Sequence, residues 1–252
     1  MRLGLAVLAT LLFGASAAGA ETAVVQAVED GRTLRLEDGR GLLLDGLLPP
    51  DAADDDRGAG VDRAANAAVR ALQTAAVGEP VAILNLLDAP DRWGRIAADA
   101  RRIRDGVWLQ ALMLRQGHAR IEACPRGDAE RLAGLRAAER AARQANRGLW
   151  ALDAYRVLDA GPRLRARAFA IVSGRPVATG GGRRVRYLNF DTNWRQDFTI
   201  RADRSAVRRL EKSGIDFEAL PGRNLEARGW LFYSNGPMLE ITCPQQIEAS
   251  EP

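Results

Sequence analysis

The sequence predicts an α+β protein, mostly β, in which two small barrels follow one another along the chain. Residues 23–48 alternate apolar and polar side chains around the turns Asp30-Gly31 and Asp38-Gly39, as antiparallel strands do. Residues 163–242 contain five short strand-like segments, with one helical segment between the third and the fourth. The 252 residues suffice for two units of about 100 to 130 residues each.

The first unit is expected to span residues 21–152. After its opening strands we expect a charged loop at residues 51–60 and then an alanine-rich helix over residues 62–76. Gly78 and Pro80 are expected to end this helix. Strands over residues 81–87 and 96–103, a helix over residues 109–115 and a long helix over residues 129–146 complete the unit.

A linker over residues 153–162 is expected to lead into the second unit. That unit covers residues 163–252, with strands predicted at residues 163–172, 185–190, 198–202, 225–233 and 238–242. Between the third and fourth strands we expect a helix over residues 205–212, with Ser205 as its N-cap. Asn235-Gly236 is typical of a hairpin turn, whereas Gly180-Gly181-Gly182 is expected to form a flexible loop.

Four blocks of the first unit occur in a characteristic order. They are Asp30 to Leu36, Leu43 to Asp51, Asp91 to Arg95 with Asp105 to Gln110 and Arg115 to Ala119 behind it, and Leu135 to Glu139 followed by Gly148-Leu149-Trp150. Together they resemble the staphylococcal nuclease (thermonuclease) family. The resemblance implies an oligonucleotide-binding (OB) type of barrel with helices, and calcium-dependent cleavage of phosphodiesters.

That chemistry needs a calcium ion held by carboxylates, two arginines on the phosphate, and a carboxylate near the attacking water. The resemblance places two of the metal carboxylates at Arg32 and Leu48, and neither side chain can bind a cation. It places one phosphate-binding arginine at Leu43 and retains the other as Arg95. The remaining carboxylate falls at Asp51. Arg95 and Asp51 are therefore the candidate catalytic residues, and we expect them to be insufficient without the metal.

The resemblance thus predicts a degenerate nuclease with no metal and no other cofactor. One alternative stays open, because Asp54, Asp55 and Asp56 follow in the same loop. A relocated site built from these carboxylates would hold calcium and restore the activity.

The order of strands and helix in the second unit is that of an OB barrel. The block from Tyr187 to Thr199, with Gly229-Trp230-Leu231, looks like the OB-like tail of some bacterial thermonuclease-family proteins. Bases stack on exposed aromatic rings, and arginines follow the phosphates. The candidate nucleic-acid-binding residues are Arg183, Arg184, Arg186, Trp194 and Arg195. Tyr187 and Phe198 are expected to point into the barrel core.

Charge is distributed unevenly along the chain. Residues 21–160 hold 20 Arg against 22 Asp and Glu, a net charge of −2, whereas residues 161–252 hold 15 Arg and Lys against 10 acids, a net charge of +5. A basic surface is typical of a nucleic-acid-binding protein. An arginine-rich composition with no such function is the alternative.

Residues 1–20 are typical of a secretory signal, with Arg2, an apolar run and small residues ending at Ala20. No later stretch is apolar and long enough to span a bilayer. We therefore expect a periplasmic or secreted protein without a transmembrane anchor. In an oxidising compartment Cys124 and Cys243 either pair, which would tie the two units together, or remain free thiols.

Three classes of function follow from the sequence. The first is a binding module for single-stranded nucleic acid or another extended polyanion. The second is an active thermonuclease-type endonuclease with a rebuilt calcium site. The third is an envelope module that binds a protein partner or an anionic lipid surface.

Overall fold

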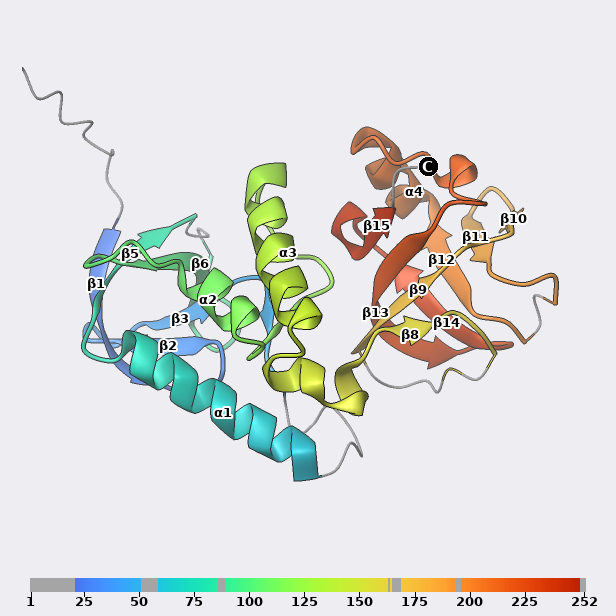
Figure 1. Cartoon of the computed structure of the whole chain (residues 1–252). Helices are drawn as coiled ribbons and strands as arrows, with labels where there is room; N and C mark the ends of the chain where they lie inside the picture. The colour runs from blue at the N-terminus through green and yellow to red at the C-terminus, as the bar shows by residue number, and fades with distance from the viewer. Residues whose placement is uncertain are drawn as a thin grey trace, which may run out of the picture.

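The computed structural model describes residues 21–50, 59–85, 89–162, 164, 169–193 and 196–249. The expected signal segment, residues 1–20, lies outside them. Two modules lie side by side, with helix α3 between their sheets (Figure 1). We call residues 21–155 the first module and residues 158–249 the second module. None of the helices in the described residues is long and apolar enough to cross a membrane.

A closed five-stranded barrel forms the first module. The order around the barrel is β1 (Glu21–Val28), β2 (Thr33–Leu36), β3 (Gly41–Leu44), β6 (Arg95–Arg102) and β5 (Pro80–Leu84). Strands β3 and β6 run parallel, and the other neighbours run antiparallel. Two short strands, β4 (Leu47–Leu48) and β7 (Arg120–Ile121), pair with each other.

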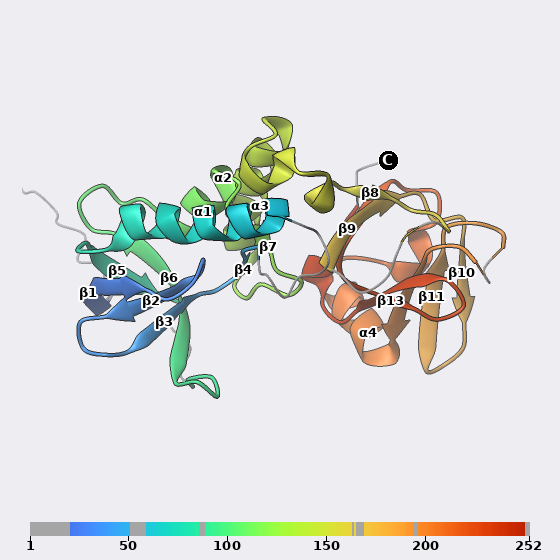
Figure 2. The ribbon, with the colours of Figure 1, turned by 90° about the horizontal axis from the view of Figure 1, so that it is seen from below.

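Three helices pack around this barrel. Helix α1 (Ala59–Ala76) lies along one side of it (Figure 2). Helix α2 (Leu109–Arg115) contacts β6, and α3 (Ala129–Gln144) packs against α2. Leu72 of α1 is fully buried in the same apolar core as Leu34 of the barrel, as expected for an amphipathic helix on a barrel.

One curled sheet forms the second module. Its order is β10 (Ala178–Gly181), β11 (Val185–Asn189), β12 (Thr199–Asp203), β14 (Pro237–Ile241), β13 (Leu225–Tyr233), β9 (Phe169–Gly174) and β8 (Leu158–Asp159), with β15 (Ile247–Ala249) paired to β13. Only residues 175–177 separate β9 from β10, so the sheet curls around its core. Helix α4 (Arg204–Lys212) buries Ala206 and Leu210 in that core.

Both modules have the same connectivity. In each, a helix follows one strand of the sheet in the chain, and an antiparallel hairpin comes next, whose second strand pairs parallel with that strand. In the first module the parallel pair is β3 and β6, and α1 comes between them in the chain. In the second module the parallel pair is β12 and β14, and α4 comes between them in the chain. One β-rich topology therefore occurs twice in this α+β chain.

Three local expectations need correction. The Gly180-Gly181-Gly182 run is not a loop throughout, because its first two residues end β10 and pair with β11. Ser205 is not the N-cap of α4: the Asp203 carboxylate accepts the first-turn amide, and the Ser205 hydroxyl donates to Asp203. In the expected linker, Leu158–Asp159 forms β8 and pairs with β9.

Arginines of α3 join the two modules. Arg136, Arg140 and Arg143 lie on one face of the helix, because their spacing of four and three residues matches its turn. Arg136 and Arg140 both form ion pairs with Glu248, at 3.1 and 2.7 Å. Arg143 donates two hydrogen bonds to the Glu226 carboxylate, at 2.9 and 2.7 Å. These contacts dock β13 and β15 on the helix.

Candidate functional site

Arg95, the first residue of β6, is held by its neighbours. Its Nε donates to Asp91 Oδ2 at 2.9 Å, and its Nη1 donates to Thr33 Oγ1 at 3.4 Å. Its guanidinium carbon lies 4.7 Å from the ring centroid of Trp93, which is 63% exposed. Desolvation alone would raise the pKa of Asp91, but the hydrogen bonds from Arg95 lower it, and the pKa lies below its ordinary value. The retained arginine is thus part of an ion pair.

A guanidinium lies where the resemblance places metal-binding carboxylates. Nη1 of Arg32 donates to the Leu47 carbonyl at 3.0 Å and lies 3.9 Å from Glu122 Oε2. Leu48 is half-buried in β4, where it pairs with Arg120 of β7. The positive charge of Arg32 would repel a metal ion at the Leu47 carbonyl.

A cleft of about 500 Å³ lies beside Arg95. Its lining residues are Leu43, Ala89, Pro90, Asp91, Arg95, Ala97 and Arg126. The structure therefore brings Arg95 and Leu43 together, whereas Arg32 and Leu48 do not line this cleft. Asp51, the second catalytic candidate, lies outside the described residues, and so do Asp54, Asp55 and Asp56.

The Glu122 carboxylate lies near Arg32 and is influenced by the charge of Asp45. Burial raises the pKa of Glu122 to about 6, and the negative charge of Asp45 adds to the shift, whereas Arg32 and Arg126 oppose it. Asp45 in turn lies 3.3 Å from Arg131 Nη2. Within the described ranges, no three His, Cys, Asp or Glu side chains gather closely enough to hold a metal ion.

Of the five predicted nucleic-acid-binding residues, the structure describes Arg183, Arg184 and Arg186, which lie at the β10–β11 hairpin. Arg183-Arg184 is exposed in the turn between β10 and β11, and neither side chain has an ion-pair partner among the described residues. Arg186 instead pairs with Glu218 at 2.5 Å. Trp194 and Arg195 lie outside the described residues. The exposed turn is therefore the part of the predicted cluster that the structure places in solvent.

Strand β11 directs Tyr187 outward. Leu188 is fully buried in the module core, and Tyr187 is half-buried on the opposite face of the strand. The expectation that Tyr187 points inward is wrong, although Phe198 is fully buried as expected. The reason is the two-residue period of a strand, in which a shift of one residue moves a side chain to the other face.

A row of side chains extends from Tyr187 across the outside of the sheet. Tyr187 lies opposite Arg201 of β12, and Arg201 lies opposite Glu240 of β14. The last paired residues of β13 and β14 are Leu231 and Leu239, and one residue beyond them strand alternation puts Trp230 and Glu240 on this same face. An ion pair of 3.1 Å between Arg201 and Glu240 agrees with this arrangement. With the neighbouring row of Asn189, Thr199, Met238 and Phe232, these residues form what we call the outer face.

A hollow of about 410 Å³ opens on the outer face. It is lined by Gly180, Gly181, Tyr187, Asn189, Thr199, Ser234, Asn235 and Met238. Gly181 has a φ of +96°, and a Cβ there would lie 3.0 Å from Tyr187 Cδ2, so the glycine leaves one side of the ring uncovered. A ring, a thioether and neutral hydrogen-bonding groups suit a flat ligand group with polar edges.

A larger hollow of about 630 Å³ lies between α3 and the second module. It includes Arg136, Arg140 and Arg143, whose charges are already paired with Glu226 and Glu248. Those pairs would have to break for an anion to bind, so the hollow on the outer face is the better candidate site.

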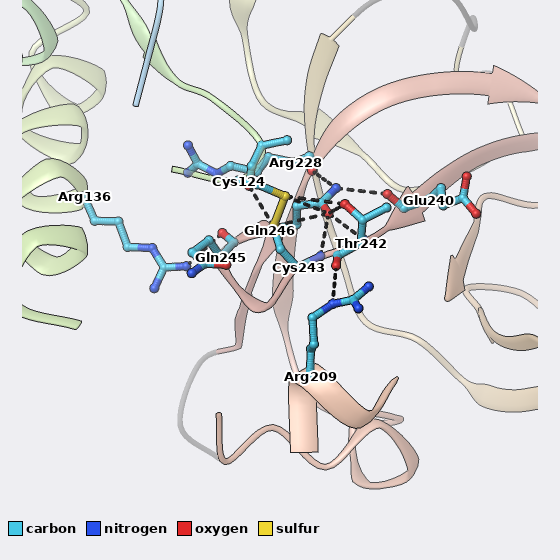
Figure 3. Close-up of a disulfide and its surroundings, with 10 residues drawn as sticks. Cys124, Arg136, Arg209, Arg228, Glu240, Thr242, Cys243, Gln245 and Gln246 are labelled. Carbon is cyan, nitrogen blue, oxygen red and sulfur yellow. Dashed lines mark hydrogen bonds between the residues drawn. A yellow bond between two sulfur atoms is a disulfide. The ribbon is translucent and has the colours of Figure 1, made fainter. Parts of the chain in front are cut away.

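A disulfide also joins the modules. Cys124, just after β7, is bonded to Cys243, just after β14, with their Cα atoms 6.0 Å apart (Figure 3). Beside it, the buried Gln246 accepts the amide hydrogens of Thr242 and Cys243 and donates to the carbonyl of Arg228 at 3.1 Å. The disulfide is therefore anchored to β13 on the second module's side.

No family model matches this chain. Among curated proteins, none matches it either.

Proposed function

We propose that this chain is an exported binding protein whose second module holds single-stranded nucleic acid, or another ring-bearing polyanion, on the outer face. The observation that carries the proposal is the hollow beside Tyr187, with Arg183-Arg184 exposed at the start of the same strand. Ring stacking would hold a base, and the exposed guanidinium groups of Arg183 and Arg184 would hold phosphate.

The connectivity of both modules supports an OB-like assignment. A five-stranded OB barrel binds oligonucleotides on the face of its second and third strands and at the loops beside them. If β9 and β10 count as one bent first strand, β11 and β12 are the second and third. The hollow lies on these strands, and Ser234 and Asn235 of the β13–β14 turn border it.

The first module, in this proposal, is a thermonuclease-like barrel that has lost its calcium-dependent activity. Three features support this. Arg32 stands in place of a carboxylate, Leu43 offers no charge to a phosphate, and Arg95 is engaged by Asp91. The metal both polarises the phosphoryl group and generates the nucleophile, so its loss removes most of the catalysis.

Export is part of the proposal. The disulfide between Cys124 and Cys243 supports a periplasmic or secreted location, since such bonds persist in oxidising compartments.

The test is the affinity of labelled single-stranded oligonucleotides, measured by fluorescence anisotropy at low salt. Tyr187→Ala should weaken binding, because stacking contributes about 1 to 3 kcal/mol per base. Tyr233→Ala is the matched control, since Tyr233 is 69% exposed and lies outside the row of Tyr187 and Trp230. Equal losses in both variants, or no binding by the unmodified protein, would overturn the proposal and favour an envelope partner. Calcium-dependent digestion of nucleic acid would instead favour the rebuilt nuclease.

A further inference from the structure

The outer face carries a second exposed ring, far from the hollow. Trp230 of β13 is 55% exposed. Its ring contacts Phe169 edge to face, with centroids 6.0 Å apart and planes at 81°. Phe169 is itself buried, and the Arg120 guanidinium lies 4.9 Å from its ring. Trp230 is thus braced by a fixed neighbour while much of its surface stays open to solvent.

Tyr187 and Trp230 occupy the two ends of one row across the sheet. Strands β12 and β14 lie between them, so their backbones are three strand spacings apart. At about 4.8 Å per spacing, this separation is about 14 Å. Strands β10 and β11 lie at the end of the module far from the first barrel, whereas β13 and β9 lie nearer to it (Figures 1 and 2).

The middle of the row is nearly neutral. Arg201 and Glu240 form an ion pair of 3.1 Å, and their side chains are 36% and 42% exposed. Such an exposed pair is held weakly. A phosphate above it would attract Arg201 and repel Glu240, so Glu240 limits how much of the Arg201 charge reaches an anion.

From this arrangement we infer that a bound single strand crosses the sheet at right angles to the strands, with one base stacked at Tyr187 and another at Trp230. Arg201 contacts the phosphate backbone between them, and Glu240 weakens that contact. The inference rests on the proposed function and specifies its ligand path. The path leads from the hollow toward the junction of the modules.

Length dependence provides the sharpest test. An octanucleotide is long enough to reach both rings, whereas a single nucleotide cannot span about 14 Å between strands. Trp230→Leu keeps an apolar cover on Phe169 but removes the stacking ring. For the octanucleotide it should weaken binding between about 5-fold and about 140-fold, which corresponds to one lost stacking contact. For a mononucleotide it should change the affinity less than twofold, while Tyr187→Ala weakens both ligands.

Glu240→Gln tests the middle of the path, and we expect it to raise the affinity for the octanucleotide. Freed from its partner, Arg201 should bind the octanucleotide more tightly and steepen the logarithmic salt dependence by at most about 0.7, the value for one complete phosphate contact. Trp230→Phe retains a ring and should bind within about threefold of the unmodified protein.

The outcomes separate the two proposals. If Tyr187→Ala weakens octanucleotide binding while Trp230→Leu, folded by circular dichroism, does not, the path is wrong and the proposed function stands. Weaker binding by Glu240→Gln would also overturn the path. If no oligonucleotide binds the unmodified protein, the proposed function itself fails.

Discussion

Glu139 of α3 and Arg228 of β13 form a buried ion pair between the modules. Glu139 Oε2 lies 2.8 Å from Arg228 Nη2, and the two side chains are 1% and 5% exposed. Glu139 Oε1 also accepts the Ile121 amide at 2.7 Å, and Arg228 Nη1 donates to the Ile121 carbonyl at 3.3 Å. One pair of charges therefore connects α3, β7 and β13.

Removing one of these charges should be costly. Glu139→Gln leaves Arg228 buried without a counter-charge, which costs about 3 to 5 kcal/mol. The measurement is the free energy of unfolding in urea. Arg140→Gln is the control, because Arg140 is 49% exposed in its pair with Glu248 and an exposed pair contributes at most about 1 kcal/mol. Equal stability of the two variants would show that the buried pair does not hold the modules together.

The disulfide predicts a redox-sensitive junction. Under denaturing conditions without reductant, Cys124 and Cys243 should give no titratable thiol. Replacing both by Ser should destabilise the protein by about 4 to 5 kcal/mol, because a bond across 119 residues restricts the unfolded chain strongly. Two free thiols per chain in freshly isolated protein would rule out the disulfide.

Glu122 predicts a loss of stability as the pH rises. Its folded pKa of about 6 lies above its ordinary value of 4.5. Its contribution is therefore complete below pH 4.5 and is lost as the pH rises through about 6. The loss is at most about 2 kcal/mol. Glu122→Gln should flatten this part of the profile and be more stable than the unmodified protein at pH 8. Identical pH profiles of the two proteins between pH 4 and 8 would contradict the assignment.

Calcium should not bind the first module with micromolar affinity, because Arg32 and Leu48 replace two carboxylates. Calorimetric titration is the measurement, and a stoichiometric micromolar site would contradict the expectation. In the double variant Arg32→Asp and Leu48→Asp, metal binding should recover better than phosphodiester cleavage. The reason is that Leu43 still stands where a phosphate-binding arginine is needed, so the phosphate lacks one positively charged contact.

Local patterns were enough to predict most strands and helices. The Asn235-Gly236 turn is a good example: both residues have positive φ, 55° and 127°, and they join β13 to β14 as predicted. The cap of α4 was misplaced because Ser205 and Asp203 are both good capping residues. Only the position of the first helical turn distinguishes them.

The candidate site was harder to predict, because its parts meet only through strand pairing. Strand alternation implies that Tyr187 and Leu188 point opposite ways, but not which of them faces the core. Strand β10 could not be predicted from the sequence, because it contains Gly180 and Gly181 and glycine is a weak signal for a strand. The row from Tyr187 to Trp230 depends on the parallel pairing of β12 with β14, which joins residues distant in sequence.

The most direct test of the central claim is a salt titration of oligonucleotide binding to the protein lacking residues 1–20, with matched single-stranded and double-stranded DNA. We expect the protein to bind the single strand more tightly than the double strand at every salt concentration. We also expect a logarithmic salt slope of about 0.7 for each phosphate contact and weaker binding of the single strand by Tyr187→Ala. Equal affinity for both forms, with no effect of Tyr187→Ala, would mean that charge alone attracts the nucleic acid and that the outer face is not its site.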